Sequence, residues 1–178
     1  MIAGQACSSV EENNVAALKP GDTAPDFDVP ALIGGVKKRF KLSDCHGKRN
    51  VVLAFHPLNW TPVCTNMTCG YESQLKDFQG LDAEVVGISV DSIMSHTAWE
   101  KAIGPLSYPL ASDFYPHGQV AQKYGVFRDK EPFPGVSDRA IFVIDKNGKI
   151  VFSRVYEIGE LPPNSEVLDV LHRLNSNK

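Results

Sequence analysis

Short, continuous apolar runs are the strongest pattern in this sequence. The run from Val51 to Phe55 is apolar at every position, which is typical of a strand buried on both faces of a sheet. Similar runs recur further along the chain, and a more mixed segment follows the last of them. The predicted strands span residues 51–55, 85–90, 140–145 and 150–155.

Helical spacing occupies most of the intervals between these strands. Ser95 is a candidate N-cap, and Gly104-Pro105 is a stop signal for the helix between them. The last predicted helix carries its apolar residues on one stripe: Val167, Leu168, Leu171 and Leu174. The predicted helices span residues 63–78, 95–103, 118–124 and 164–174.

Two glycine-containing turns predict hairpins. Gly34-Gly35 joins residues 32–33 to residues 37–42, and Asn147-Gly148 is a type I′ signal between the last two strands. Early alternation of strands and helices implies parallel pairing, to which the second hairpin adds an antiparallel pair. We predict an α/β protein with a thioredoxin-like fold: a mixed central sheet flanked by helices, with an N-terminal β-hairpin extension. Residues 18–178 form one domain after a flexible tail, 1–17.

Charge and hydropathy exclude several functions. The formal net charge is −3, and no basic cluster of the kind that neutralises nucleic-acid phosphates is present. No apolar run approaches the ~18 residues of a membrane span. The polar first residues lack the features of a signal peptide, so we expect a cytoplasmic protein without nucleic-acid or membrane partners. Four cysteines in 178 residues do not make a disulfide scaffold.

Cys64 has the most informative position among these cysteines. It follows a buried strand and a loop, and it stands where a helix is predicted to begin. The first backbone N–H groups of a helix lack internal partners and carry partial positive charge, which stabilises a thiolate. Ionisation alone gains only a few-fold in reactivity, because a more acidic thiol is also a weaker nucleophile.

A reactive thiolate therefore needs neighbours that align the substrate and stabilise the charge developing on the leaving atom. Thr61 is one turn before Cys64 and can supply a hydroxyl. Arg139 opens the third predicted strand and can supply a cation that stays charged when buried. Pro57 and Pro62 stiffen the loop and limit the access of water.

Cys69 is the second cysteine of interest. Five residues of regular helix separate two side chains by ~7.5 Å of rise and about 140° of azimuth. A disulfide needs Cα atoms within ~7 Å, so a continuous helix forbids the bond between Cys64 and Cys69. If the two cysteines join, the first turns of the helix must unwind, which is among the less costly local openings. Cys7 and Cys45 stand alone, and we interpret both as incidental.

These residues resemble the peroxiredoxin family from about Lys19 to Leu174. Its Pro-x-x-x-Thr/Ser-x-x-Cys signature is matched by Pro57, Thr61 and Cys64. The segment from Arg139 to Asp145 resembles the family's arginine-bearing strand. The resemblance implies that Cys64 is the peroxidatic cysteine, that Thr61 and Arg139 activate it and the peroxide, and that Pro57 shields the sulfenic acid.

Subgroup features are mixed. The Cys-Thr-x-x-x-Cys-Gly pattern from Cys64 to Gly70 is similar to the Q type (the bacterioferritin-comigratory group), in which the second cysteine, here Cys69, resolves the first. The pair His56-Pro57 is instead similar to the one-cysteine subgroup. Met67 departs from the family, which usually has Glu or Gln there, so the group that orients Arg139 is left open.

The resemblance implies a thioredoxin-dependent peroxidase that reduces hydrogen peroxide and alkyl hydroperoxides, as a monomer or homodimer, with no cofactor and no metal. One alternative is a one-cysteine peroxidase resolved by an external thiol such as glutathione. A thiol-disulfide exchanger is disfavoured because no Cys-x-x-Cys pair is present. A non-enzymatic thioredoxin-like module, for instance a Cu(I) carrier, is a further alternative.

Overall fold

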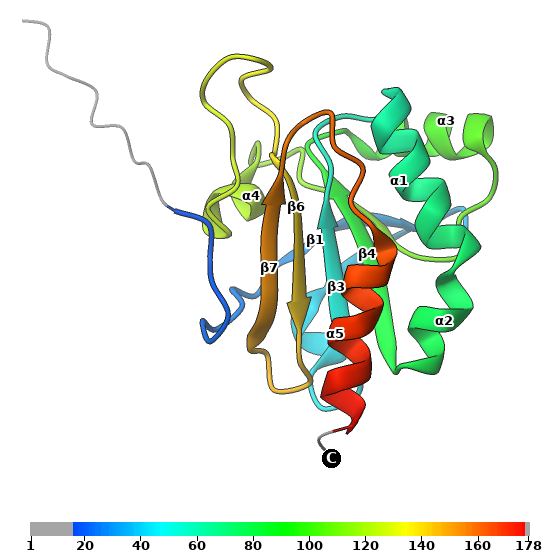
Figure 1. Ribbon diagram of the computed structural model, residues 1–178. Coiled ribbons are helices and arrows are strands. Elements are labelled where there is room, and N and C mark those ends of the chain that lie inside the picture. Colours follow the sequence, from blue (N-terminus) through cyan, green and yellow to red (C-terminus); the bar gives the residue numbers. More distant parts are fainter. Residues whose placement is uncertain (1–15, 177–178) are drawn as a thin grey trace, which may run out of the picture.

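A seven-stranded mixed sheet forms the centre of the computed structural model, which describes residues 16–176. The strand order is β2-β1-β5-β4-β3-β6-β7, and helices cover both faces (Figure 1). The strands are β1 (Asp28–Ile33), β2 (Val36–Lys41), β3 (Asn50–Phe55), β4 (Ala83–Ser89), β5 (Leu110–Ser112), β6 (Arg139–Ile144) and β7 (Ile150–Tyr156). The helices are α1 (Pro62–Ser73), α2 (Leu75–Gly80), α3 (Ile93–Ile103), α4 (Gln119–Lys123) and α5 (Asn164–Ser176), with a 3-10 turn, η1 (Leu42–Cys45).

This arrangement confirms the predicted α/β thioredoxin-like class with its N-terminal hairpin, β1–β2. As expected, β3 and β4 pair in parallel, while β6 lies antiparallel to both β3 and β7. Most of the predicted tail, 1–17, lies outside the described residues, as does Cys7. The division into a tail and one domain stays a prediction.

Strand β3 shows why this part of the chain is apolar without interruption. Val51, Leu53 and Phe55 belong to one buried cluster, and Val52 and Ala54 belong to the other. Successive side chains of a strand point to opposite faces, so a strand between two cores needs apolar residues at every position. Helices α1, α2, α3 and α5 contribute to the core on one face, and α4 contributes to the core on the other.

Two elements differ from the prediction: one expected helix is divided, and one strand was missed. The helix expected over 63–78 is two helices, because the backbone leaves helical geometry at Gln74 (φ −110°, ψ 13°). The change of direction lets Leu75 and Phe78 of α2 reach the same core as α1, so tertiary packing overrides the local pattern. Strand β5 was not predicted; it has only three residues and is held by β4 on one side and β1 on the other.

The turn between β6 and β7 also differs from the expected type I′ turn. A type I′ turn needs positive φ at both central residues, whereas only Gly148 is in the left-handed region here, with φ 77°. The Asp145 carboxylate accepts hydrogen bonds from the backbone N–H groups of Asn147 and Lys149, at 2.9 and 2.8 Å. This side-chain turn stabilises a longer loop and keeps Asn147 out of the left-handed region.

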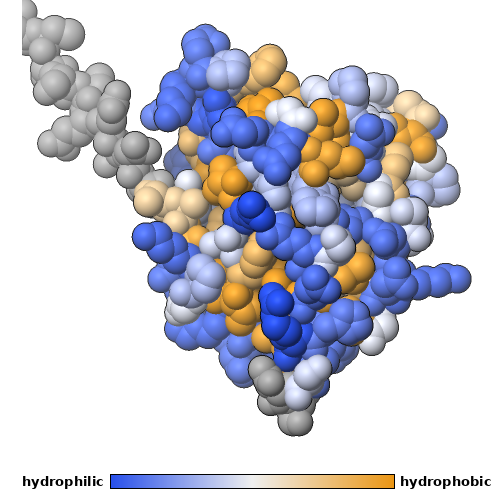
Figure 2. All heavy atoms as spheres, viewed as in Figure 1, coloured by the Kyte–Doolittle hydropathy of each residue, from blue (hydrophilic) through white to orange (hydrophobic). Residues whose placement is uncertain are grey.

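The surface of the molecule is mixed in character. On the face seen in Figure 2, apolar residues form patches within a largely hydrophilic surface, and one such patch lies where the loops meet at the top of the molecule. Within residues 16–176, no helix has the length and apolar character needed to cross a membrane. The cytoplasmic location stays a prediction.

Candidate active site

Cys64 lies in the first turn of α1, as the sequence predicts. Thr61 is the N-cap of this helix, in an extended conformation, and Pro62 occupies the first helical position, where a missing N–H costs nothing. The Thr61 hydroxyl oxygen accepts a hydrogen bond from the Cys64 N–H at 3.4 Å. The cap therefore fixes the backbone of Cys64 directly, and the positive end of the helix lies beside its sulfur.

The Thr61 hydroxyl is thus engaged with the backbone. Its own proton points to the carbonyl of Leu58, at 3.4 Å, and the hydrogen bonds of residues 16–176 include none between this hydroxyl and the Cys64 sulfur. The sequence led us to expect this hydroxyl near the sulfur, and the contact that the structure shows is with the amide of the same cysteine. Thr61 also lines the cavity onto which Cys64 opens.

Arg139 reaches the sulfur from the sheet. It is the first residue of β6, next to the end of β3, and its Nη2 lies 3.5 Å from the Cys64 Sγ. The side chain is only 1% exposed. The contact places a guanidinium N–H donor directly at the sulfur, in a position shielded from solvent.

Two groups that the sequence did not reveal orient Arg139. The carbonyl of Ile158, just after β7, accepts from Nε at 3.1 Å and from Nη2 at 2.8 Å. The Met67 sulfur accepts from Nη1 at 3.3 Å, where the family resemblance led us to expect a carboxylate or an amide. A backbone carbonyl has no sequence signature, so only the fold could identify Ile158. The guanidinium makes no ion pair with a carboxylate within the described residues.

A cavity of about 210 Å³ gives access to this pair. Cys64 is 1% exposed, yet it lines the cavity together with Arg139, so the sulfur is recessed without being sealed. The remaining lining residues come from the loop before α1, the start of α1, the segment after α4 and the segment after β7: Pro57, Leu58, Thr61, Pro62, Val63, Phe133, Ile158 and Gly159. Four of the five site residues proposed from the sequence, Pro57, Thr61, Cys64 and Arg139, therefore meet at one cavity, and the fifth, Cys69, does not line it.

Cys69 lies on the same unbroken helix as Cys64, and both are free thiols. It is half-buried and does not line the cavity. The continuous helix keeps the two sulfurs apart, as the helical geometry requires. Cys45, at the end of η1, is also half-buried, and burial raises the pKa of its thiol. A raised pKa disfavours the thiolate form of Cys45, as expected for an unreactive cysteine.

A second polar cluster joins the β3–α1 loop to α3. The Asn59 amide bridges two buried histidines: its Oδ1 is 2.9 Å from the His56 Nε2 and its Nδ2 is 3.1 Å from the His96 Nδ1. The His96 Nε2 is 3.1 Å from the carbonyl of Ala111, so the pattern is satisfied when both rings are neutral and protonated at Nε2. The Asp91 carboxylate accepts from the Asn59 N–H at 2.9 Å.

Burial is the main cause of the low basicity of these rings. It lowers the pKa of His56, and it lowers the pKa of His96 to about 4, with a further contribution from the neighbouring His56. Neither ring lines the cavity of Cys64. The structure links His56 through Asn59 to His96, and these three residues had no recognisable spacing in the sequence.

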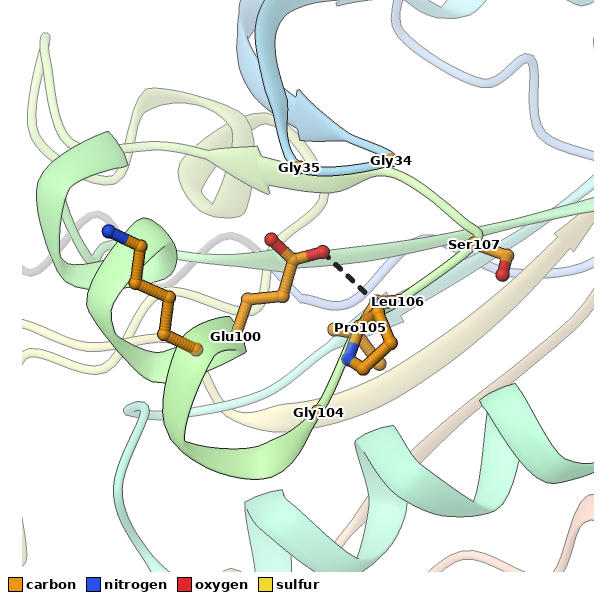
Figure 3. A pocket seen from close by; sticks show the side chains of 8 residues that line it. Gly34, Gly35, Glu100, Gly104, Pro105, Leu106 and Ser107 are labelled. Atoms are coloured by element: carbon orange, nitrogen blue, oxygen red, sulfur yellow. Dashed lines mark hydrogen bonds between the residues drawn. The ribbon is translucent and has the colours of Figure 1, made fainter.

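A cavity larger than that of Cys64 lies elsewhere. It measures about 570 Å³ between the β1–β2 turn and the end of α3, and one Glu100 carboxylate oxygen there accepts from the Leu106 N–H at 3.1 Å (Figure 3). The described residues that line it include no cysteine, histidine or arginine. No group of three or more potential metal ligands occurs within residues 16–176. Chemistry, rather than size, therefore places the candidate site at Cys64.

The fold and this site together define a thioredoxin-like thiol enzyme, in which a recessed cysteine at a helix start faces a buried arginine. The sequence matches the AhpC/TSA family over residues 20–153, and the chain belongs to this peroxiredoxin family. It is a thiol peroxidase and an oxidoreductase. The predicted family and enzyme class are therefore confirmed.

Named relatives agree with this assignment. Mouse (Mus musculus) peroxiredoxin-2 is 38% identical over 157 residues, covering 85% of this chain and 75% of that protein. A mitochondrial thioredoxin-dependent peroxide reductase from Drosophila melanogaster is 36% identical, covering 91% of this chain and 68% of that protein. The reduced 2-Cys peroxiredoxin of Plasmodium vivax superimposes with a TM-score of 0.83 at 30% identity, covering 89% and 83% of the two chains.

Proposed function

We propose that this chain reduces hydroperoxides by attack of the Cys64 thiolate on an O–O bond. The sulfur bonds to one oxygen, the O–O bond breaks, and the other oxygen leaves with the electron pair and takes up a proton. Cys64 becomes a sulfenic acid and the peroxide becomes an alcohol or water. The observation that carries the proposal is the 3.5 Å contact between the Arg139 Nη2 and the Cys64 sulfur at the start of α1.

Arg139 has two roles in this proposal. Its charge stabilises the thiolate before the reaction, and its N–H groups stabilise the charge that develops on the leaving oxygen. Four hydrogen bonds to described residues leave one of its five N–H groups without a protein acceptor, and the cavity is the place where a peroxide oxygen can accept it. Thr61 fixes the Cys64 backbone and lines the cavity, and Pro57 shields the sulfenic acid.

Cys69 is the proposed resolving cysteine. Its thiol condenses with the Cys64 sulfenic acid, releasing water and forming a disulfide, which a thioredoxin-like dithiol then reduces. The Cys-x4-Cys spacing supports the Q-type interpretation. The name of the Plasmodium vivax neighbour, a 2-Cys peroxiredoxin, supports a second cysteine in the reaction but not this subgroup. The name of the Drosophila relative supports thioredoxin as the class of reductant. Because α1 is continuous, resolution requires local unwinding of its first turns.

One observation favours the alternative, in which an external thiol attacks the sulfenic acid. Cys69 is half-buried on an unbroken helix and lies outside the cavity of Cys64. An incoming thiol such as glutathione could use the open cavity without any unwinding. The monomeric or homodimeric state and the cytoplasmic location stay predictions.

Rapid mixing of the reduced protein with hydrogen peroxide, followed by intact mass measurement, tests both routes. Fast consumption of one equivalent with loss of two hydrogens supports the internal disulfide, and gain of one oxygen supports the external route. Cys64→Ser should abolish both changes. Cys69→Ser should convert the first mass change into the second.

Cys45→Ser is the matched control, because Cys45 is also half-buried and does not line the cavity. It should react like the unmodified protein. Full turnover of Cys69→Ser with thioredoxin would contradict the resolving role. Consumption of peroxide by Cys64→Ser at the original rate would contradict the whole proposal.

A further inference from the structure

The cavity of Cys64 has a polar end and an apolar wall. Its polar side chains are Cys64, Thr61 and Arg139. The other side chains that line it carry no polar atom, and they surround the approach to the sulfur: Pro57, Leu58, Pro62, Val63, Phe133 and Ile158. A peroxide whose O–O bond lies between the sulfur and the guanidinium would therefore place its substituent against an apolar wall. Hydrogen peroxide has no substituent to occupy that wall.

Phe133 is the most unusual part of this wall. Its side chain is 55% exposed, and its backbone φ of 63° lies in the left-handed region, which is costly for a bulky aromatic residue. Among the described residues, it is the only one that the segment between α4 and β6 contributes to the cavity lining. An exposed aromatic side chain on a strained backbone is unfavourable for stability, so we look for its role in the cavity that it lines.

The loop that carries Phe133 is held by hydrogen bonds on both sides. The Arg128 side chain donates from Nε to the Pro132 carbonyl at 3.1 Å and forms an ion pair with Asp138 at 2.5 Å. The backbones of Arg128 and Gly135 are joined by an N–H to carbonyl bond of 2.8 Å. These contacts fix the loop, so the Phe133 ring stays exposed beside the cavity although it does not pack into the core.

We propose that Phe133 is a specificity-determining residue that favours hydroperoxides with an apolar organic substituent over hydrogen peroxide. This proposal rests on the proposed reaction at Cys64. The hydroperoxide oxygens occupy the polar end of the cavity, and the alkyl or aryl group packs against Phe133, Leu58 and Val63. The organic substituent keeps its contact with the Phe133 ring in the transition state. This contact raises the rate constant for organic hydroperoxides and not for hydrogen peroxide, which has no substituent.

The test measures the second-order rate constant of a single turnover with three peroxides: hydrogen peroxide, tert-butyl hydroperoxide and cumene hydroperoxide. A single turnover needs no reductant, so any role of Phe133 in docking a reductant does not enter the result. Phe133→Ala should lower the rate with cumene hydroperoxide by about tenfold, lower the rate with tert-butyl hydroperoxide less, and leave the rate with hydrogen peroxide unchanged. Phe133→Leu should restore most of the loss.

Phe114→Ala is the matched control. Phe114 is exposed to nearly the same extent, 53%, and does not line the cavity, so its removal should change none of the three rates. Phe133→Gly relieves the positive φ and should show the same selectivity as Phe133→Ala, which separates loss of the ring from a backbone effect.

An equal loss with all three peroxides, or no loss with cumene hydroperoxide, would overturn the specificity role. If the unmodified protein consumed none of the peroxides, the proposed reaction would fail instead. If it consumed hydrogen peroxide faster than the organic substrates and Phe133→Ala left that order and those rates intact, only the specificity proposal would fail.

Discussion

Two buried polar clusters at the β3–α1 loop are built in opposite ways. In one, the cationic Arg139 contacts the Cys64 sulfur, and both residues line a cavity. In the other, the Asn59 amide joins His56 and His96 in a neutral chain of hydrogen bonds, and neither histidine lines that cavity. Both clusters are removed from solvent, and both involve residue types that are common in catalysis.

The difference shows that burial of titratable groups does not by itself mark a reactive site. The histidine chain is neutral and its hydrogen-bonding groups are matched, so it acts as structure. In the other cluster, two of the acceptors of the Arg139 guanidinium are sulfur atoms, which accept hydrogen bonds weakly, and a cavity lies beside them. The guanidinium can therefore still bind a substrate. Changes in the first cluster should therefore affect chemistry most, and changes in the second should affect stability most.

The largest effect is expected for Arg139→Lys. Lysine lacks the fork that reaches the Ile158 carbonyl and the Cys64 sulfur together, so alignment and charge stabilisation are both impaired. We expect the single-turnover rate with hydrogen peroxide to fall by about 10²–10³. Arg173→Lys, at an exposed position on α5, should leave the rate unchanged. A loss of less than about threefold for Arg139→Lys would remove the guanidinium from the mechanism.

The histidine chain should make stability depend on pH. Burial lowers the pKa of His96 from 6.5 to about 4, so the unfolded chain binds more protons between these values. The stabilisation is complete above pH 6.5 and is lost as the pH falls towards 4; for His96 it amounts to about 3 kcal/mol. His56 acts in the same direction, whereas the Asp91 carboxylate opposes the shift of both rings.

Urea unfolding at a series of pH values measures this dependence. His96→Gln should flatten the slope between pH 6.5 and 4, and His172→Gln, at an exposed position on α5, should not. An unchanged slope in His96→Gln would show that the carboxylates alone set the acid response.

A smaller effect is expected for Asn59→Ala. The change leaves the His56 Nε2 and the His96 Nδ1 without their shared partner inside the protein, and we expect the free energy of unfolding to fall by about 2 kcal/mol. Asn66→Ala, at an exposed position on α1, is the control. If Asn59→Ala lowered the peroxide rate as strongly as Arg139→Lys while stability stayed constant, the two clusters would not be functionally separate.

The smallest effect is expected for Thr61→Val, which removes the cap but keeps the shape of the side chain. We expect a loss of about 1 kcal/mol in the free energy of unfolding, measured by urea titration. Thr61→Ser keeps the hydroxyl and should restore the cap. If Thr61→Val reduced the peroxide rate with no loss of stability, the hydroxyl would act on the substrate rather than on the helix.

Residue type and spacing predicted the parts of the molecule that are fixed locally. The run from Val51 to Phe55 gave β3 within one residue, and the position of Cys64 at a helix start was correct. Features fixed by contacts between distant segments were missed: the three residues of β5, the change of direction at Gln74, and the Ile158 carbonyl that orients Arg139. None of these has a periodic or compositional signal.

Arg139 has no acidic partner within residues 16–176, and this matters once Cys64 is oxidised. In the proposed reaction a thiolate balances the guanidinium, but a sulfenic acid is neutral, so the reaction leaves a buried cation with neutral acceptors only, which is unfavourable. Loosening the start of α1 brings more water to the guanidinium and relieves this cost. We therefore expect the amides of residues 64–66 to exchange hydrogen faster in oxidised than in reduced Cys69→Ser, so that the chemical step itself prepares the exposure that its resolution requires.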